Sequence, residues 1–177
     1  MASLPQLIEE DVRQLDRILQ ELLANSEATT ALIIDKGGFL ITHSGDSEQF
    51  DLTTIAALAS GAFLANQTIA NLINEENFDS VYQQGEKHSM FAVNVDEFCL
   101  LVLIFPAIVS VGAVKYFAVR SCTRVARQLE IAQERDPEGG LDLSVLNVAD
   151  TSEFFTRKKS EEPPPVRKRI RQIPDGD

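Results

Sequence analysis

Residues 98–105, "FCLLVLIF", are apolar at every position, and Pro106 follows them directly. The run is too short to cross a membrane. A strand that is apolar on both sides lies in the interior of a sheet whose two faces are both covered. The rest of the chain must therefore supply strands on both sides of this segment and helices over both faces.

Four more segments have the composition of strands, and short links separate them. "TTALIID" and "FLITHS" flank "KGG", where Gly37 or Gly38 supplies the positive φ of a hairpin turn. "FDSVYQQG" and "KHSMFAVNV" precede the central strand, with turns at Gly85-Glu86 and Asp96-Glu97. Short links join antiparallel neighbours, so the sequence predicts a five-stranded antiparallel sheet.

Three helices are predicted from apolar residues that recur at helical spacing. The first covers residues 4–25, behind a capping box of Ser3 and Gln6. The second follows Asp51 and ends near Asn74, and the third covers roughly residues 110–135. The order α-β-β-α-β-β-β-α predicts an α+β domain with helices on both faces of the sheet.

The composition changes after the third helix. "DPEGG" ends the domain, which is predicted over residues 1–136. Residues 137–177, with three consecutive prolines and basic segments, are predicted to form a flexible C-terminal tail. From residue 157 onward, seven Lys/Arg face four Asp/Glu, or +3, so the remainder of a chain with net charge −11 carries −14.

The acidic charge and the cysteine content restrict the class of partner. A net charge of −11 disfavours nucleic acid and anionic membranes as partners. Cys99 and Cys122 lie in apolar surroundings, and the N-terminus has acids where a secretory signal has bases and an apolar core. The sequence therefore predicts free thiols and a cytoplasmic location.

Motifs for chemistry are missing from the sequence. It has neither a GxxxxGK[ST] phosphate loop nor GxGxxG. His43 and His88 each stand alone in a strand, without partners at metal-ligand spacing, and are predicted to be structural. Cys99 is predicted to be a packing residue, and Asp96-Glu97 a turn rather than an acid pair. We expect no catalytic, cofactor-binding or metal-binding residues, and nothing in the sequence argues for an enzyme.

The second helix lies in residues 52–74, which contain no charged residue. At 100° per residue, one side is predicted to face the sheet: Ile55, Leu58, Ala59, Ala62, Ile69 and Ile73. The opposite side is predicted to face outward: Thr53, Ala57, Ser60, Gly61, Leu64, Gln67, Thr68 and Asn71. Loss of charge and small side chains are typical of interface cores. We expect an intermolecular interface, most simply between two copies; the alternative is a helix buried within a larger domain.

Element order and local sequence resemble the Roadblock / dynein light chain family, in its bacterial MglB-like branch. The matching segments are "ALIIDKGGFLITHSG", "LASGAFLANQTIANLI", "VYQQGEKHSMFAVNV" and "FCLLVLIF". The resemblance covers about residues 5–135 and implies a homodimer whose sheets join edge to edge with paired second helices. It also implies binding of one small Ras-like GTPase of the MglA type across that pair, stimulation of GTP hydrolysis, and a role in polarity or motility of bacteria.

Carried over from the family, the dimer and GTPase-binding helix includes Thr53, Ala57, Ser60, Gly61, Leu64, Thr68 and Asn71. Between Lys36 and Lys87 the chain has no Arg or Lys, so this helix cannot supply an arginine finger. The resemblance then implies activation by positioning the GTPase's own groups. Two alternatives remain open: a scaffold of the same family that binds without accelerating hydrolysis, and a small-molecule sensor with a deep apolar pocket.

The third helix offers a second candidate surface. Its only charges over residues 111–129 are the basic residues Lys115, Arg120, Arg124 and Arg127. The first helix carries Glu9, Glu10, Asp11, Asp16 and Glu21. In the structural interpretation, these basic and acidic side chains form ion pairs between the third and first helices. In the functional interpretation, the basic residues are a docking site for a further polarity protein.

Overall fold

The computed structural model describes residues 4–135 and contains the predicted elements in the predicted order. The helices are α1 (Glu9–Ser26), α2 (Leu52–Leu72) and α3 (Val111–Glu134). The strands are β1 (Thr30–Asp35), β2 (Leu40–Gly45), β3 (Ser80–Gln83), β4 (His88–Asn94) and β5 (Cys99–Pro106). The predicted tail lies outside the described residues.

The five strands form one sheet in the order β2-β1-β5-β4-β3, and every neighbouring pair is antiparallel. The apolar segment is its central strand, with β1 on one side and β4 on the other. Residues 99–105 are all buried, which confirms the prediction for this strand.

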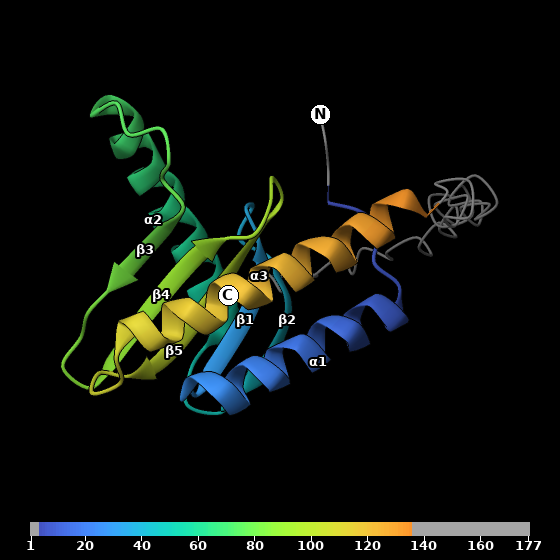
Figure 1. Ribbon diagram of the computed structural model, residues 1–177, viewed down its shortest axis with the longest axis horizontal. Helices are drawn as coiled ribbons and strands as arrows, with labels where there is room; N and C mark the ends of the chain where they lie inside the picture. Colours follow the sequence, from blue (N-terminus) through green and yellow to red (C-terminus); the bar gives the residue numbers. More distant parts are fainter. Residues whose placement is uncertain (1–3, 136–177) are drawn as a thin grey trace, which may run out of the picture. The chain divides into compact units, whose positions relative to one another are not determined.

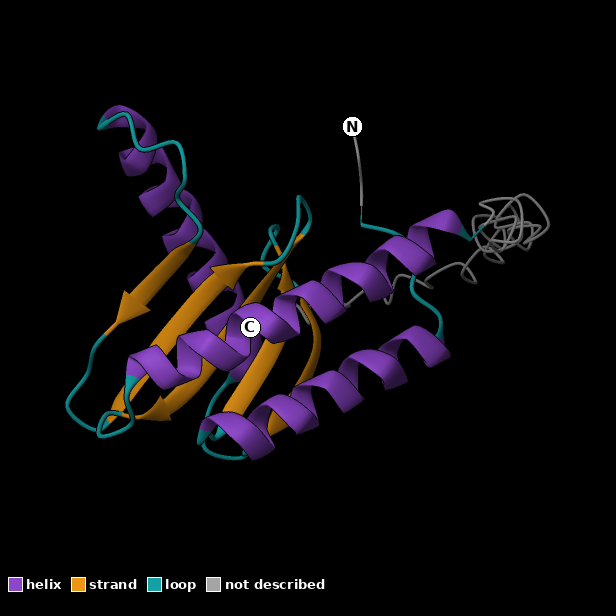
Figure 2. Cartoon of the chain, viewed as in Figure 1, coloured by secondary structure: helices purple, strands orange, loops and turns teal. Residues whose placement is uncertain are grey.

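Helices cover both faces of the sheet, as Figure 1 shows: α1 and α3 lie side by side on one face, and α2 lies on the other. Because β-strand side chains alternate between faces, β5 contributes to two separate cores. Cys99, Leu101, Leu103 and Phe105 pack beneath α1 and α3, while Leu100, Val102 and Ile104 pack beneath α2. Figure 2 shows the resulting three layers.

The predicted start of the first helix is wrong: α1 begins at Glu9 rather than at residue 4. The Asp11 carboxylate accepts a hydrogen bond from the Ile8 backbone N–H at 2.9 Å, which caps the helix there. Leu4 and Leu7 pack against the core from outside the helix, which explains why their spacing extended the predicted pattern. Ser3 of the predicted capping box lies outside the described residues.

Asp11 also ties the two helices of this face together. Its side chain is 1% exposed and accepts hydrogen bonds from Arg135, at 2.7 and 2.8 Å, and from Gln128 at 2.9 Å. The Arg135 hydrogen bonds, outweighing desolvation, lower the pKa of Asp11 from 3.8 to about 2. A buried carboxylate is tolerated here because cationic and neutral donors surround it.

This pKa predicts a pH-dependent contribution to folding. A lowered folded-state pKa gives stability that is present above pH 3.8 and is lost as the pH falls toward 2. We expect Asp11→Asn to lower the free energy of unfolding by about 2 kcal/mol at neutral pH. We further expect the difference from the wild type to shrink below pH 4. Urea unfolding of both proteins at several pH values measures it, and a difference that stays constant down to pH 2 would contradict the assignment.

Candidate functional site: the outer face of α2

The buried side of α2 differs from the predicted one. Its buried residues are Leu52, Ala56, Ala59, Ser60, Phe63 and Ala70. Of the predicted inward residues only Ala59 is buried, whereas Leu58, Ile69 and Ile73 are 68%, 54% and 70% exposed. Phe63, 1% exposed and 5.1 Å from Phe78 between ring centroids, anchors the helix. The observed inward direction is turned by roughly a quarter of a helical turn from the predicted one.

Ser60 is therefore a correction to the predicted outward face. It is 2% exposed, and its hydroxyl donates a hydrogen bond to the backbone carbonyl of Lys36 at 2.6 Å. Because a buried hydroxyl needs a partner, this bond fixes the middle of α2 against the turn between β1 and β2. Ser60 serves the placement of the helix and is not available for direct contact.

The other residues predicted for the outer face are accessible. Thr53, Ala57, Gly61, Leu64, Thr68 and Asn71 are exposed, and Gln67 is half-buried. The true outward direction adds Thr54, Leu58, Ala65 and Leu72. None of these side chains is charged. We call the exposed residues Ala57, Leu58, Gly61, Leu64, Ala65, Thr68 and Leu72 the α2 face. The small side chains of this surface let the backbone of a partner come close, and its leucines can be buried against that partner.

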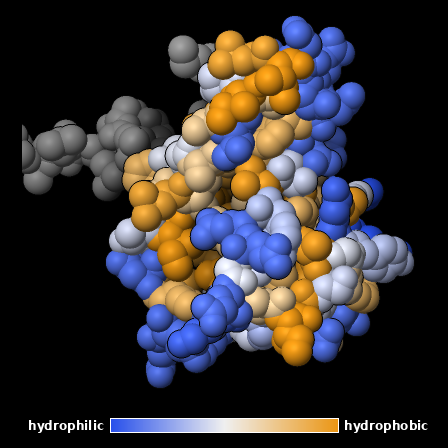
Figure 3. Space-filling view, turned by 90° about the vertical axis from the view of Figure 1, so that its left-hand side faces the viewer, coloured by the Kyte–Doolittle hydropathy of each residue, from blue (hydrophilic) through white to orange (hydrophobic). Residues whose placement is uncertain are grey.

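The C-terminal end of α2 projects past the sheet (Figure 1). Leu72 is 78% exposed there, next to the exposed Ile69 and Ile73. Figure 3 faces this side of the molecule and shows apolar surface at its upper end. Exposed large apolar side chains that lie together mark interaction sites in soluble proteins.

The turn between β1 and β2 extends the α2 face. Gly38 has φ +94, which confirms one of the two predicted turn glycines, and an added Cβ there would lie 3.0 Å from the Cα of Ala57. Phe39 follows it and is 74% exposed. Its backbone N–H donates to the Asp35 carboxylate at 2.9 Å. An exposed aromatic ring on a fixed turn suits a binding surface, and no sequence pattern distinguishes this phenylalanine from the apolar residues of the strand that follows it.

A groove of about 370 Å³ runs between α2 and the strands β3 and β4. Leu58, Ala62 and Met90 line it with Phe50 and His88, whose rings meet edge-on at 5.5 Å. The groove opens along the exposed Leu58 flank of α2, and its other wall consists of β4 together with Gln83 of the edge strand β3. Its lining supports an apolar contact, and the pairing of His88 with Phe50 gives that histidine a packing role.

By length and composition alone, α2 also qualifies as a membrane span, as no other helix in residues 4–135 does. Here one side of the helix packs on the sheet through Phe63 and its neighbours. The apolar residues of α2 that pack in the core of the folded domain therefore contribute to the high hydropathy of this helix.

The described residues give no cluster of three or more side chains able to hold a metal ion. Cys99 and Cys122 are buried, and burial raises the pKa of each thiol to about 12. Both thiols are therefore protonated at neutral pH, in agreement with the packing role predicted for Cys99. The exposed apolar surface described above is of the kind that binds protein.

A family model described as Roadblock/LC7 domain matches residues 14–105, slightly more than half of the chain. No curated protein matches. A solved structure of MglB in a tetrameric arrangement is 29% identical, with a TM-score of 0.69, and the match covers 75% of this chain and 99% of that one. The gliding protein MglB of Thermus thermophilus is 29% identical, with a TM-score of 0.67, over 74% of this chain and 99% of its own. Myxococcus xanthus MglB is 26% identical, also with a TM-score of 0.67, over 74% of this chain and 99% of its own.

Proposed function

Because the chain belongs to the Roadblock/LC7 domain family, we propose that it is a homodimeric regulator of a small Ras-like GTPase of the MglA type. It has no active site of its own in this role and stimulates hydrolysis by its partner. The observation that carries the proposal is the uncharged, exposed α2 face, on the side of the sheet that α1 and α3 leave free. The likeness to MglB supports the choice of branch.

The dimer forms through the β3 edge of the sheet and the adjacent flank of α2. β3 has four residues and is the last strand of the described sheet, so its outer edge offers free backbone groups. Leu58 lines the groove toward this edge, and the exposed Ile69 and Ile73 follow on the same flank of α2 at helical spacing. A second copy related by a two-fold axis covers both features at once.

We expect the protein to have twice the mass of one chain by light scattering at micromolar concentration. Ile69→Glu should shift it toward the monomer, because the change places a charge in the apolar contact. Ile131→Glu on α3 is the matched control, since Ile131 has similar exposure, 46% against 54%, on the opposite side of the sheet. A wild-type protein that stays monomeric, or equal dissociation of both variants, contradicts this interface.

Binding of the GTPase uses the part of the α2 face that the second copy leaves open. Ala57, Gly61 and Thr68 are small and exposed, so the switch loops of a GTPase can approach the helix backbone closely. Phe39 stands beside them on its turn. A pair of such helices doubles the surface without adding charge.

Activation proceeds without an arginine finger from the α2 face. Between Lys36 and Lys87 the chain has no Arg or Lys, and the Lys36 ammonium donates to the backbone carbonyl of Asp96 at 2.7 Å. An inserted arginine contributes about 10³–10⁵ in rate to other GTPases. The stimulation must instead come from holding the switch loops and the GTPase's own catalytic groups in the reactive arrangement.

Single-turnover GTP hydrolysis by an MglA-type GTPase, with this protein titrated in, tests the proposal. We expect the rate to rise and to saturate at two chains per GTPase. Saturable binding with an unchanged rate would favour the alternative, a non-activating adaptor that recruits the GTPase. Absence of binding would reject both. The proposed setting is the bacterial cytoplasm, in cell polarity or gliding motility, with a cell pole as a site of concentration.

A further inference from the structure

A basic surface lies on α3, on the sheet face opposite α2. From residue 98 to residue 129 the chain has no Asp or Glu, and four cations, Lys115, Arg120, Arg124 and Arg127, lie exposed on α3 within this range. At 3.6 residues per turn the three arginines share the outer side of the helix. An acid-free, basic helix side is unexpected on a chain of net charge −11.

The expected pairing with α1 accounts for only one of these cations. Arg124 forms an ion pair with Glu21 of α1, and its hydrogen bond lowers the pKa of that glutamate. Among residues 4–135, neither Lys115, Arg120 nor Arg127 has an acidic side chain within ion-pair distance. The structural interpretation therefore holds for Arg124 and leaves three cations without an ion pair to any other described residue.

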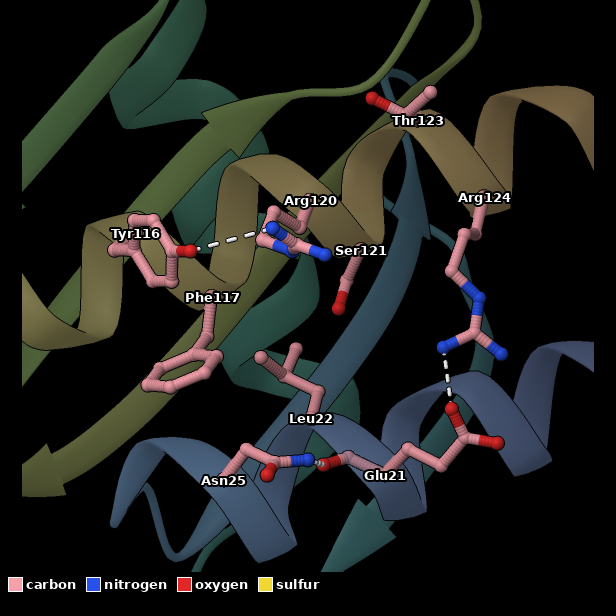
Figure 4. A pocket seen from close by; sticks show the side chains of 9 residues that line it. All are labelled: Glu21, Leu22, Asn25, Tyr116, Phe117, Arg120, Ser121, Thr123 and Arg124. Atoms are coloured by element: carbon pink, nitrogen blue, oxygen red, sulfur yellow. Dashed lines mark hydrogen bonds and ion pairs between the residues drawn. The ribbon is translucent and has the colours of Figure 1, made fainter.

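A groove between α1 and α3 adjoins these charges and has aromatic walls (Figure 4). Its volume is about 650 Å³, and Leu22 and Phe117 line it. Tyr116 is 58% exposed, and the guanidinium of Arg120 lies 5.7 Å from the centroid of its ring and donates to its hydroxyl at 3.2 Å. Arginine and tyrosine are the residue types that dominate binding energy at protein interfaces.

We propose that this surface binds a short acidic peptide segment of another protein. It consists of Tyr116, Phe117, Arg120 and Arg124 around the groove, together with Arg127 about one turn further along α3, and we call it the α3 arginine groove. Arg120 and Arg127 are separated by about 10 Å along the helix, which matches carboxylates a few residues apart on a peptide. Guanidinium groups bind carboxylates through two parallel hydrogen bonds, and the aromatic walls accept an apolar side chain between the acids.

The limited length of the α3 arginine groove favours a peptide over a nucleic acid or a membrane. Glu130 and Glu134 follow the arginines on α3, and Glu97 of the β4–β5 turn lies with Arg127 around a neighbouring groove. A long polyanion would meet these acids within about one screening length, roughly 10 Å at 0.1 M salt. A peptide with its acids confined to one segment avoids that repulsion.

Fluorescence anisotropy with the full-length protein tests the proposal directly. The probe is a short fluorescein-labelled peptide of Asp and Glu around a central Leu, and the control peptide carries Asn and Gln in place of the acids. We expect saturable binding of the acidic peptide that weakens as salt rises from about 0.05 to 0.5 M. Arg120→Glu/Arg127→Glu should raise its Kd at least about tenfold.

The matched control is Arg13→Glu/Arg17→Glu on α1, which changes the net charge equally at two positions of another helix. It should alter the Kd for the acidic peptide less than about twofold. Charges on α1 that do not contact the peptide act on it only through screened, long-range electrostatics. Both double variants should stay folded and unfold cooperatively, although Arg13→Glu also removes the exposed ion pairs of Arg13 with Glu9 and Glu10. Each of the following results overturns the proposal: equal loss in both variants, equal binding of the uncharged peptide, retained binding in the α3 variant, or a preference for duplex DNA or anionic vesicles.

Discussion

Replacement of Ala57 by arginine should weaken binding of an MglA-type GTPase by about a hundredfold or more and abolish stimulation of its GTP hydrolysis. Ala57 is exposed on the α2 face, and the backbone of Gly38 lies against it. A long cation at this place separates the two proteins or is buried without a partner, which costs several kcal/mol by order of magnitude. Thr68→Arg, about three turns further along the exposed side, should act in the same way.

Gln133→Arg on α3 supplies the control, because it adds the same side chain to an exposed helix position on the other face of the sheet. Isothermal titration gives the affinity, and light scattering on each variant separates loss of the GTPase from loss of the dimer. A folded, dimeric Ala57→Arg protein with normal affinity and stimulation would remove the α2 face from the proposed function.

Gly45→Ala should destabilise the domain by about 3 kcal/mol or more, a large part of a typical folding free energy. Gly45 ends β2 with φ +97, and an added Cβ would lie 2.0 Å from the backbone carbonyl oxygen of Thr29. Moving β2 away from this contact would cost further stability, because Gly45 pairs with Thr30 of β1 in the sheet. Urea denaturation measures the loss, and an unchanged midpoint would show that the close approach does not exist in solution.

Gly61→Ala is the matched substitution, with the opposite expected sign. An added Cβ at Gly61 meets no atom within 4 Å, and glycine within a helix costs about 0.5–1 kcal/mol relative to alanine. We expect a gain in stability of that size for the isolated subunit. Because Gly61 lies on the α2 face, a simultaneous loss of affinity for the GTPase would indicate that the missing side chain serves close approach.

The sheet could be predicted from the sequence because its determinants are local. The all-apolar β5 can lie only in the centre, and short turns force antiparallel neighbours. The turn at Gly38 was also visible, since "KGG" separates two apolar runs.

The orientation of α2 could not be predicted, because its apolar residues surround the helix rather than forming one stripe. Leu58, Ile69 and Ile73 fit an inward stripe as well as Phe63 does, and only the position of the sheet decides between them. The same ambiguity places Ser60 on the outward side of the helical wheel, because the sequence does not show which backbone carbonyl accepts its hydrogen bond. The six other residues named for the contact helix lie at exposed positions, and their role in binding stays a prediction.

The order of the strands also has a consequence for how the chain folds. The β1–β2 hairpin and the β3–β4–β5 meander each consist of neighbours in sequence, so each can form early from local contacts. The two meet only where β1 pairs with β5, with Thr30 opposite Ile104 and Asp35 opposite Cys99. Pairing of β1 with β5 joins segments about 70 residues apart in the chain, and such non-local contacts form slowly, so we expect this step to set the folding rate. Until these two strands pair, the apolar edges of β1 and β5 remain exposed, and β1 of one nascent chain can pair with β5 of another.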